Sequence, residues 1–370
     1  MTKNTFIDCS GQKPDDKLDF WEPVVIPKED IDAEIARLAA LPRPANGRRQ
    51  SMIVHPRWRE LGKGPGLTPG IRVTMEVLLP GEETAPIRHN STQANFCIQG
   101  SGTSIVDGKR IDFKQYDIWN FPSMATYRHI NDSKEMHVRF SYSNAPLLEK
   151  MNVHIVEENP PPPELKAVEA AKAEEVEDAT LFKPKTIKIS DDGAYLMPYE
   201  VLINPESVKS EALYWPWKRV KEELDELGSL NKNYKGRRLY MMWNPATGRH
   251  NGITPSFFAT ITIRPANIVD RPHRHVSAAI NYYFAGRGRS TVEGKVYEWK
   301  AGDLMLSAPG WAIHNHASKE EQVYELTIQD QPLNIYMESL LWQEDLKKPW
   351  RVLGSDIGFD TNRGGLSKAS

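Results

Sequence analysis

The chain has 370 residues, and at roughly 100–200 residues per domain this length predicts two or three domains. Its 47 basic and 49 acidic side chains nearly cancel, which gives no electrostatic case for a nucleic acid or an anionic membrane as partner. No stretch approaches the ~20 apolar residues of a membrane span, and the start lacks the apolar run of a signal peptide. Two cysteines are too few for a disulfide framework, so we expect a cytoplasmic protein.

The first 50 residues are expected to form an arm followed by a helix. The opening 27 residues show no periodic pattern and are expected to be irregular. From Pro27 to Leu41, the apolar residues Ile31, Ile35 and Leu38 recur with helical spacing. Such a helix most often packs on the outside of a β domain.

Residues 51–155 show the pattern of an all-β domain. The segment from Ile71 to Leu79 alternates apolar and polar residues, as a half-buried strand does. Asp107-Gly108 separates two further short apolar segments, which predicts a β-hairpin. Tight turns and short strands continue to Pro122, so this region favours a small β-barrel.

The second half of the chain repeats the landmarks of the first at one constant separation of 186 positions. The matched pairs are His89 and His275, Gly100 and Gly286, Gly102 and Gly288, Gly108 and Gly294, and Asp117 and Asp303. Five matches without a gap predict two copies of one domain, the second over residues 237–345.

Residues 156–236 are expected to link the two copies. Prolines 160–163 predict a stiff polyproline segment, and the Ala/Glu/Lys-rich segment 164–178 predicts a solvated helix. A second helix is expected over 220–227 and should end at Gly228. Residues 346–370 are polar and glycine-containing, and they suit either a loose tail or an arm onto a partner subunit.

Three histidines stand out in the second copy. His273 and His275 are two residues apart, so both imidazoles lie on one face of a strand. His314 follows 39 positions after His275, on a later expected strand. Three neutral imidazoles on a rigid β scaffold can hold a divalent first-row metal and leave positions open for chemistry. Satisfied core histidines or surface histidines are the alternative, but the doubled histidine and the spaced third one favour a metal.

These motifs resemble a known family. Pro272 to His275, the paired glycines 286 and 288, Gly302-Asp303 and the spacing from Pro309 to His314 resemble the two-part cupin motif. The duplicated layout resembles a bicupin, and it is most similar to gentisate 1,2-dioxygenase and to its 1-hydroxy-2-naphthoate, salicylate and hydroquinone ring-cleaving relatives. The resemblance implies an all-β dominated fold of two double-stranded β-helix (jelly-roll) barrels with a few peripheral helices.

The resemblance also implies a ligand set. His273, His275 and His314 would hold Fe(II), although the same imidazoles bind Mn, Ni or Zn. The glutamate typical of cupins is absent, since Ala279 and Ile280 occupy its positions. His316 would then be an acid/base close to the substrate, because its unperturbed pKa near 6.5 suits proton transfer.

The first copy departs from this pattern. Ile87 stands where the first ligand would be, Gln93 takes the carboxylate position and Tyr127 replaces the third histidine, which leaves His89. His129 matches His316. We therefore expect a degenerate first barrel without a metal, which has a structural or interface role.

Contacts with the substrate are expected from the strands around the histidines. If alternation continues past His275, then Asn281 and Tyr283 point inward with the ligands. Arg287 or Arg289 could pair with a substrate carboxylate, or both could be solvent-exposed arginines. Trp311 could form the wall of an aromatic pocket or pack in the core.

Together these features predict a non-haem Fe(II)-dependent dioxygenase that uses O2 to cleave a small hydroxylated aromatic compound of the gentisate, salicylate or hydroquinone type. The alternatives are a metal-cupin isomerase or decarboxylase acting on a small polar acid, and a non-catalytic bicupin. Oxygen consumption with an aromatic pocket separates the first from the second. Barrels with exposed edges commonly assemble, so a homo-oligomer, a dimer or tetramer, is expected.

Overall fold

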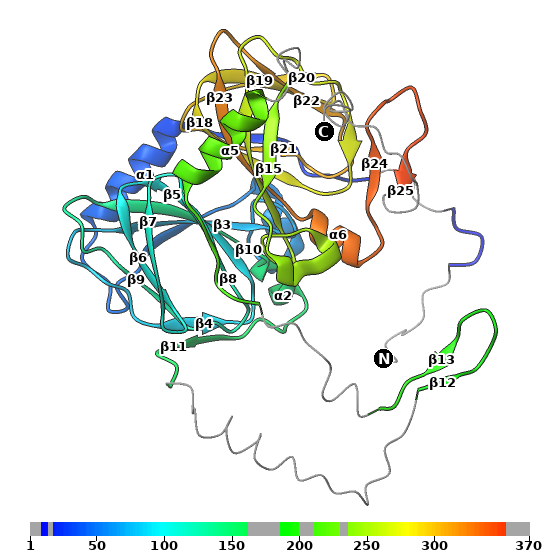
Figure 1. Ribbon diagram of the computed structural model, residues 1–370, viewed down its shortest axis with the longest axis horizontal. Coiled ribbons are helices and arrows are strands. Elements are labelled where there is room, and N and C mark those ends of the chain that lie inside the picture. The colour runs from blue at the N-terminus through cyan, green and yellow to red at the C-terminus, as the bar shows by residue number, and fades with distance from the viewer. Residues whose placement is uncertain (1–8, 14–17, 162–185, 200–209, 230–235, 353–370) are drawn as a thin grey trace, which may run out of the picture.

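A computed structural model describes residues 9–13, 18–161, 186–199, 210–229 and 236–352. It contains two β-barrels of the same design, one built mainly from the first half of the chain and one from the second (Figure 1). In each barrel a six-stranded antiparallel sheet faces smaller antiparallel sheets, one of five strands in the first barrel and two of three strands in the second. The expected all-β fold of two barrels is confirmed.

The first barrel has strands in two sheets. Its larger sheet has the order β14 (Tyr214–Trp215), β8 (Ile118–Phe121), β5 (Gln93–Gln99), β10 (His137–Ser143), β3 (Arg72–Leu78), β2 (Arg49–Ile53). Its smaller sheet has the order β11 (Val156–Glu158), β4 (Ile87–His89), β9 (Tyr127–Ile130), β6 (Ser101–Val106), β7 (Lys109–Lys114). Asp107 and Gly108 both have positive φ in the β6–β7 turn, as the predicted hairpin requires.

The second barrel repeats this order. Its larger sheet runs β1 (Val24–Ile26), β21 (Leu304–Ala308), β18 (Ala279–Ala285), β23 (Val323–Gln329), β16 (Phe258–Arg264), β15 (Arg238–Met241). Opposite lie β20 (Lys295–Lys300), β19 (Arg287–Val292) and β22 (His314–Ser318), and then β17 (Arg274–His275), β24 (Leu341–Gln343) and β25 (Arg351–Val352). A short hairpin, β12 (Ile187–Lys188) and β13 (Tyr195–Leu196), lies in the linker region.

Helices lie around the barrels. They are α1 (Lys28–Ala40), α2 (Ala145–Lys150), α5 (Trp217–Ser229) and α6 (Gln331–Tyr336), with short 3-10 helices at Pro56–Leu61 and Pro245–His250. Helix α1 agrees with the prediction. Helix α5 begins three residues earlier than predicted and continues through Gly228, so that glycine does not end it. The helix predicted over 164–178 lies outside the described residues. Of the predicted tail 346–370 only residues 346–352 are described, and they include strand β25.

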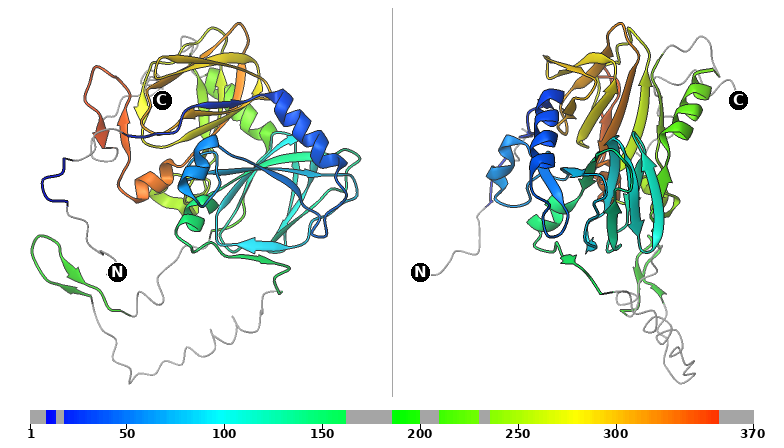
Figure 2. Two further views of the ribbon diagram at one scale, coloured as in Figure 1. Left: turned by 180° about the vertical axis from the view of Figure 1, so that it is seen from behind. Right: turned by 90° about the vertical axis from the view of Figure 1, so that its left-hand side faces the viewer.

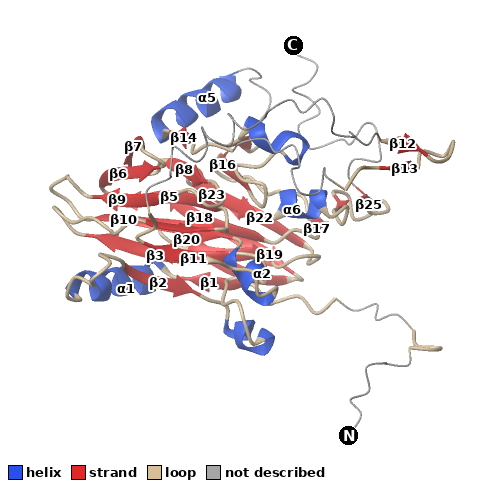
Figure 3. Ribbon diagram, turned by 90° about the horizontal axis from the view of Figure 1, so that it is seen from below, coloured by secondary structure: helices blue, strands red, loops and turns tan. Residues whose placement is uncertain are grey.

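The expectation of an irregular arm through residue 27 is wrong at its end, because Val24–Ile26 pairs with β21 of the second barrel. The two barrels thus exchange edge strands: the N-terminal arm adds β1 to the second barrel, and the linker between the copies adds β14 to the first barrel by pairing with β8. Each of these strands is followed by a proline and then by a helix, α1 or α5. The two helices lie on opposite sides of the strand layers (Figures 2 and 3).

Two equivalent aspartates hold the chain in place where each exchanged strand leads into its helix. Asp303 accepts a hydrogen bond from the backbone N–H of Lys28 at 2.7 Å, and Asp117 accepts one from Trp217 at 2.7 Å. Both donors are the first residues of their helices, where N–H groups lack a partner within the helix. The exchange therefore ties the N-terminal arm and the linker to the barrel that each one completes.

The outer faces of the two larger sheets pack against each other and form one shared core. Phe96 and Phe140 of the first barrel contact Tyr282 and Phe284 of the second, with ring centroids 5.2–5.9 Å apart. Because side chains alternate along a strand, the residues between these aromatics point into the barrels. Those inward positions are largely polar, as at Asn281, which leaves each barrel interior suited to a functional site.

No helix among the described residues is long and apolar enough to cross a membrane.

Candidate metal centre in the second barrel

The three predicted ligands come together inside the second barrel. His273 and His314 form an antiparallel bridge in which each backbone N–H donates to the other's carbonyl, at 3.0 and 2.9 Å. His275 lies two residues on, on the same face as His273. One ligand nitrogen from each ring lies within 4.8 Å of the other two, and all three side chains are buried.

Backbone carbonyls determine which nitrogen of each ring carries the proton. The Nδ1 atoms of His273, His275 and His314 lie 3.0, 2.8 and 2.9 Å from the carbonyl oxygens of Arg271, Ser277 and Ala312. A carbonyl only accepts, so each Nδ1 must donate. Each Nε2 then keeps a lone pair, which is the arrangement that metal-binding histidines need.

Burial keeps the three rings neutral. It lowers the pKa of His275 to about 3 and that of His314 well below its ordinary value, and His273 shifts in the same direction. The neighbouring imidazoles add to the lowering for His275 and His314. Near neutral pH the three Nε2 atoms therefore carry no proton and can each donate a lone pair to a metal.

These observations fit a divalent metal better than a set of satisfied core histidines. In the described part of the chain each ring uses only Nδ1 for hydrogen bonds, although satisfied histidines would also pair Nε2. The same part of the chain holds no other converging group of three His, Cys, Asp or Glu side chains. Three nitrogens supply a partial coordination shell and leave room for exogenous ligands.

His316 lies on the same face of β22 as His314, with ring centroids 5.7 Å apart. Its Nδ1 is 2.7 Å from the hydroxyl of Ser290, which accepts a hydrogen bond from the Trp299 indole at 2.9 Å. Because the indole can only donate, the Ser290 hydroxyl keeps its proton free to donate to Nδ1, and in that tautomer Nε2 of His316 carries the ring proton. Burial, aided by the charge of Arg264, lowers the pKa of His316 well below 6.5, so the ring is neutral.

Asn281 and Tyr283 point into the barrel, as predicted. The Asn281 amide donates to Thr327 at 2.8 Å and accepts from Ser307. Tyr283 stacks on Trp299 with ring centroids 3.7 Å apart. Both residues are thus engaged with the barrel wall, and the part they play toward a substrate remains a prediction.

The predicted arginines Arg287 and Arg289 are not brought to the triad. Ser290 pairs with His316 in the β19–β22 register, so the alternating residues 287 and 289 point outward and are exposed. Arg287 faces two surface glutamates at 3.7–3.9 Å. This placement fits the alternative interpretation, in which both are solvent-exposed.

Trp311 also lies away from the ligands. The guanidinium of Arg274 sits 4.5 Å from its ring centroid. Arg274 lies between His273 and His275 on the strand, so its side chain points to the opposite face. Trp311 is therefore not placed as a wall around the three imidazoles.

Two residues that the sequence reasoning missed lie beside the triad. Trp342 of β24 pairs with His275, and its ring centroid lies 4.7 Å from that of His275 and 5.9 Å from that of His273. The charge of Arg237 lowers the pKa of His273, His275 and His316, so its guanidinium lies within electrostatic range of all three. Arg237 also reaches Asp270 at 3.4 Å. Neither residue has a sequence spacing that relates it to the histidines.

The first barrel presents a different set of groups at the equivalent positions. Ile87, His89 and Tyr127 replace the three ligands, and the Tyr127 hydroxyl lies 3.0 Å from Nε2 of His89. Of these three residues only His89 carries an imidazole, and its Nε2 already has a hydrogen-bond partner. His129 keeps the contact with a serine, Ser104, at 2.9 Å.

Comparisons with known families match each barrel separately. Residues 74–143 match the model described as "Cupin domain", and residues 257–352 match the model described as "AraC-like ligand binding domain".

Three curated relatives share sequence with the chain. Gentisate 1,2 dioxygenase 1 of Aquipseudomonas alcaligenes is 23% identical over 288 residues, which is 75% of this chain and 77% of that protein. 5-aminosalicylate 1,2-dioxygenase of Comamonas sp is 25% identical over 70% of this chain and 67% of that protein. 5-nitrosalicylic acid 1,2-dioxygenase of Bradyrhizobium sp is 32% identical over 136 residues, which is 35% of this chain and 65% of that protein.

The fold is similar to that of a salicylate 1,2-dioxygenase from Pseudaminobacter salicylatoxidans, with a TM-score of 0.71 and 16% identity over 92% of this chain and 94% of that one. A structure of the same enzyme with gentisate gives a TM-score of 0.69 and 16% identity over 88% and 86% of the two chains.

Proposed function

Since this chain is a bicupin related to the gentisate and salicylate 1,2-dioxygenases, we propose that it is an Fe(II)-dependent dioxygenase that cleaves the ring of a hydroxylated aromatic acid. One observation carries the proposal: three buried imidazoles converge, with their Nδ1 atoms held by backbone carbonyls and one ligand nitrogen of each ring within 4.8 Å of the other two. His273, His275 and His314 would hold the metal.

When bound, Fe(II) would supply coordination sites for the substrate oxygens and for O2. The chain's own residues set the electrostatics around it. Three neutral ligands leave the charge of a divalent ion uncompensated, which favours an ionised phenol and a carboxylate as partners. We assign His316 as a hydrogen-bond donor through Nε2–H, because a ring whose pKa is this low is a poor base near neutral pH.

We further propose that Arg237 pairs with the substrate carboxylate. Its side chain is 21% exposed, and its charge acts on two of the three ligand histidines as well as on His316. A guanidinium can bind a carboxylate through two parallel hydrogen bonds, which would orient the ring. This assignment replaces Arg287 and Arg289.

Trp342 is proposed as the aromatic wall of the substrate site. Its indole ring lies against both His273 and His275, and Nε1 donates to Glu344 at 3.0 Å. An aromatic substrate next to the metal would meet an aromatic face there, and such contacts favour offset or edge-to-face packing. This role takes the place of the one predicted for Trp311.

Oxygen uptake after anaerobic reconstitution tests the proposed function. The protein is loaded with Fe(II) and given gentisate, substituted salicylates, hydroquinones and, as controls, aliphatic hydroxy acids. We expect oxygen consumption and loss of the aromatic absorbance with at least one phenolic compound. Turnover of a small polar acid without oxygen would instead support an isomerase or decarboxylase and would contradict the proposal.

A cytoplasmic homo-oligomer, a dimer or tetramer, is proposed as the working form. Cys97 is buried and Cys9 is exposed, and neither forms a disulfide. Large apolar side chains remain exposed on one protomer, among them Met151, Ile155 and Tyr336. Such surfaces often mark contacts between subunits. Light scattering at micromolar concentration should give a mass of two or four chains, and a monomer would refute the assembly.

A further inference from the structure

Asn144 and Asp330 occupy equivalent positions in the two copies, close to the contact between the barrels. The side chain of Asn144 hydrogen-bonds to a serine of the other copy, whereas that of Asp330 faces a glycine. Asn144 and Asp330 each follow the last strand of the larger sheet that their copy contributes, and each begins a short helix, α2 or α6. Asn144 Oδ1 accepts from the backbone N–H of Thr92 at 2.9 Å, and Asp330 Oδ1 accepts from that of Ala278 at 2.8 Å. In both copies Oδ1 therefore accepts a hydrogen bond from the equivalent backbone N–H.

The second side-chain atom differs. Asn144 Nδ2 donates to the hydroxyl of Ser256, at 2.9 Å, on a loop of the other copy. The position equivalent to Ser256 in the first copy is Gly70. A Cβ added to Gly70 would lie 3.1 Å from Asp330 Oδ2. Asp330 Oδ2 therefore faces Gly70, at the position where the other copy has Ser256.

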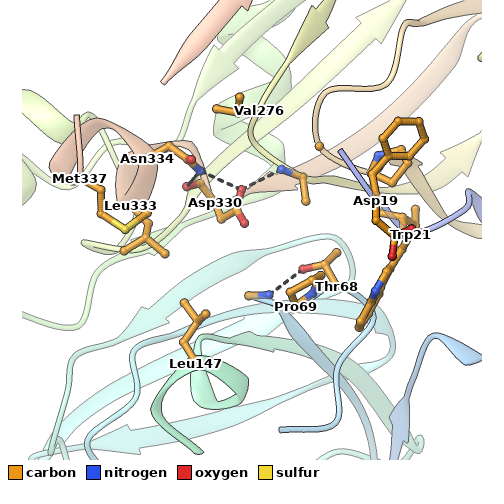
Figure 4. A pocket seen from close by; sticks show the side chains of 16 residues that line it. Asp19, Trp21, Thr68, Pro69, Leu147, Val276, Asp330, Leu333, Asn334 and Met337 are labelled. Atoms are coloured by element: carbon orange, nitrogen blue, oxygen red, sulfur yellow. Dashed lines mark hydrogen bonds between the residues drawn. The ribbon is translucent and has the colours of Figure 1, made fainter. Parts of the chain in front are cut away.

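A cavity of about 300 Å³ opens at this place, between the two barrels (Figure 4). Its walls are mostly apolar and come from distant parts of the chain, including Trp21 of the arm, Pro69, Leu147 of α2, and Leu333 and Met337 of α6 and its end. Volumes of this size accommodate small organic ligands. The close-up shows the Asp330 carboxyl between the α6 residues and the Thr68–Pro69 loop.

The charges around the cavity are one-sided. Among the described residues, those lining it include Asp19 and Asp330 but no lysine, arginine or histidine. Asp19 already pairs with Arg57 at 2.7 Å. Lys150 donates to the backbone oxygen of Pro69 and is not part of the lining. Burial raises the pKa of Asp330 to about 7, as expected for a carboxyl without a cationic partner.

We propose that this cavity is a second ligand site, which takes a small organic ammonium compound with an apolar body. The ammonium would donate to Asp330 Oδ2, and the apolar body would pack against Trp21, Leu147 and Met337. A carboxylate in an apolar pocket gains most from a partner that brings both a positive charge and a hydrogen-bond donor. An anion would meet the Asp330 carboxyl and no lysine, arginine or histidine in the described part of the lining, which disfavours organic acids of the class proposed as substrate.

Titration calorimetry with 2-phenylethylamine on the full-length protein tests the site. We expect one saturable site per chain, and a loss in affinity of at least about tenfold in Asp330→Asn and in Gly70→Ser. Both variants reproduce residues that the other copy already holds at the equivalent position, Asn144 and Ser256, so the fold should tolerate them. Gly70→Ser would fill the opening and give Oδ2 a partner within the chain.

Matched controls separate this site from the metal centre and from nonspecific binding. Ser256→Gly changes the equivalent loop of the other copy and should leave the affinity for 2-phenylethylamine unchanged. His314→Ala should also leave it unchanged, so the result does not depend on the proposed dioxygenase activity. Phenylacetate should not compete. Absence of saturable binding below about 10 mM, or equal affinity in Asp330→Asn and the unmodified chain, would overturn the proposal.

Discussion

Replacing Asp330 by asparagine should make the protein more stable, and the gain should grow with pH. The carboxyl has an ordinary pKa of 3.8, and burial raises it to about 7 in the folded chain. The folded state therefore holds a proton between these two values that the unfolded state has released. By linkage the stability of the native chain falls as pH rises through this window.

The size of the effect follows from the two pKa values. A difference of about 3 units corresponds to about 4 kcal/mol once the pH is above 7, and to about 2 to 3 kcal/mol between pH 5 and pH 8. Asparagine keeps the oxygen that accepts from Ala278 N–H and carries no charge, so it should not lose stability in this way. The stability of Asp330→Asn relative to the unmodified chain should thus rise by about 2 to 3 kcal/mol from pH 5 to pH 8.

Urea unfolding of the metal-free protein, followed by tryptophan fluorescence at pH 5 and pH 8, measures this difference. Asp191→Asn is the control, because Asp191 is fully exposed in the β12–β13 turn. The control should change stability equally at the two pH values. If Asp330→Asn also shifts stability by the same amount at both, the pKa of Asp330 is not raised in the folded chain and the reasoning is refuted.

Three further substitutions test other parts of the structure. Asp303→Ala should cost about 1 to 3 kcal/mol in unfolding free energy, because the N–H of Lys28 loses its partner; an unchanged urea midpoint would contradict the strand exchange. Ser277→Ala removes the hydroxyl 3.0 Å from Nδ1 of His275 and should weaken metal binding up to about tenfold in a competition titration with a chelator, whereas unchanged affinity would show that the carbonyl alone orients the ring. Arg237→Gln should raise KM for a carboxylated phenol by about 10- to 100-fold and leave KM for an uncarboxylated hydroquinone nearly unchanged; equal effects on both would rule out carboxylate pairing.

The convergence of the three histidines could be predicted because local patterns indicate it. Strand alternation places His273 and His275 on one face, and the spacing of five residues after Pro309 identifies His314. The same spacing after Pro122 places Tyr127 at the equivalent position of the first barrel, and there the tyrosine hydroxyl contacts His89. The duplication, the hairpins and helix α1 rest on equally local patterns.

What could not be predicted depends on contacts between distant segments. Val24–Ile26 is too short to show a pattern, and its partner strand lies about 280 positions later. Arg237, which directly precedes β15, and Trp342 of β24 come from segments that have no fixed spacing to the triad. The register of β19 against β22, which turns Arg287 outward, is set by pairing and not by the strand's own sequence. The sequence gives no sign that His316 is buried, so it could not predict that burial in the folded barrel lowers the pKa of this ring.

Metal content per chain in three proteins tests the central claim most directly. The unmodified chain, His314→Ala and His89→Ala are each reconstituted anaerobically with Fe(II), desalted and measured by elemental analysis. We expect about one iron per chain in the unmodified protein and in His89→Ala, and almost none in His314→Ala. Equal loss from the two variants, or full iron content in His314→Ala, would contradict a metal centre formed by the three imidazoles of the second barrel.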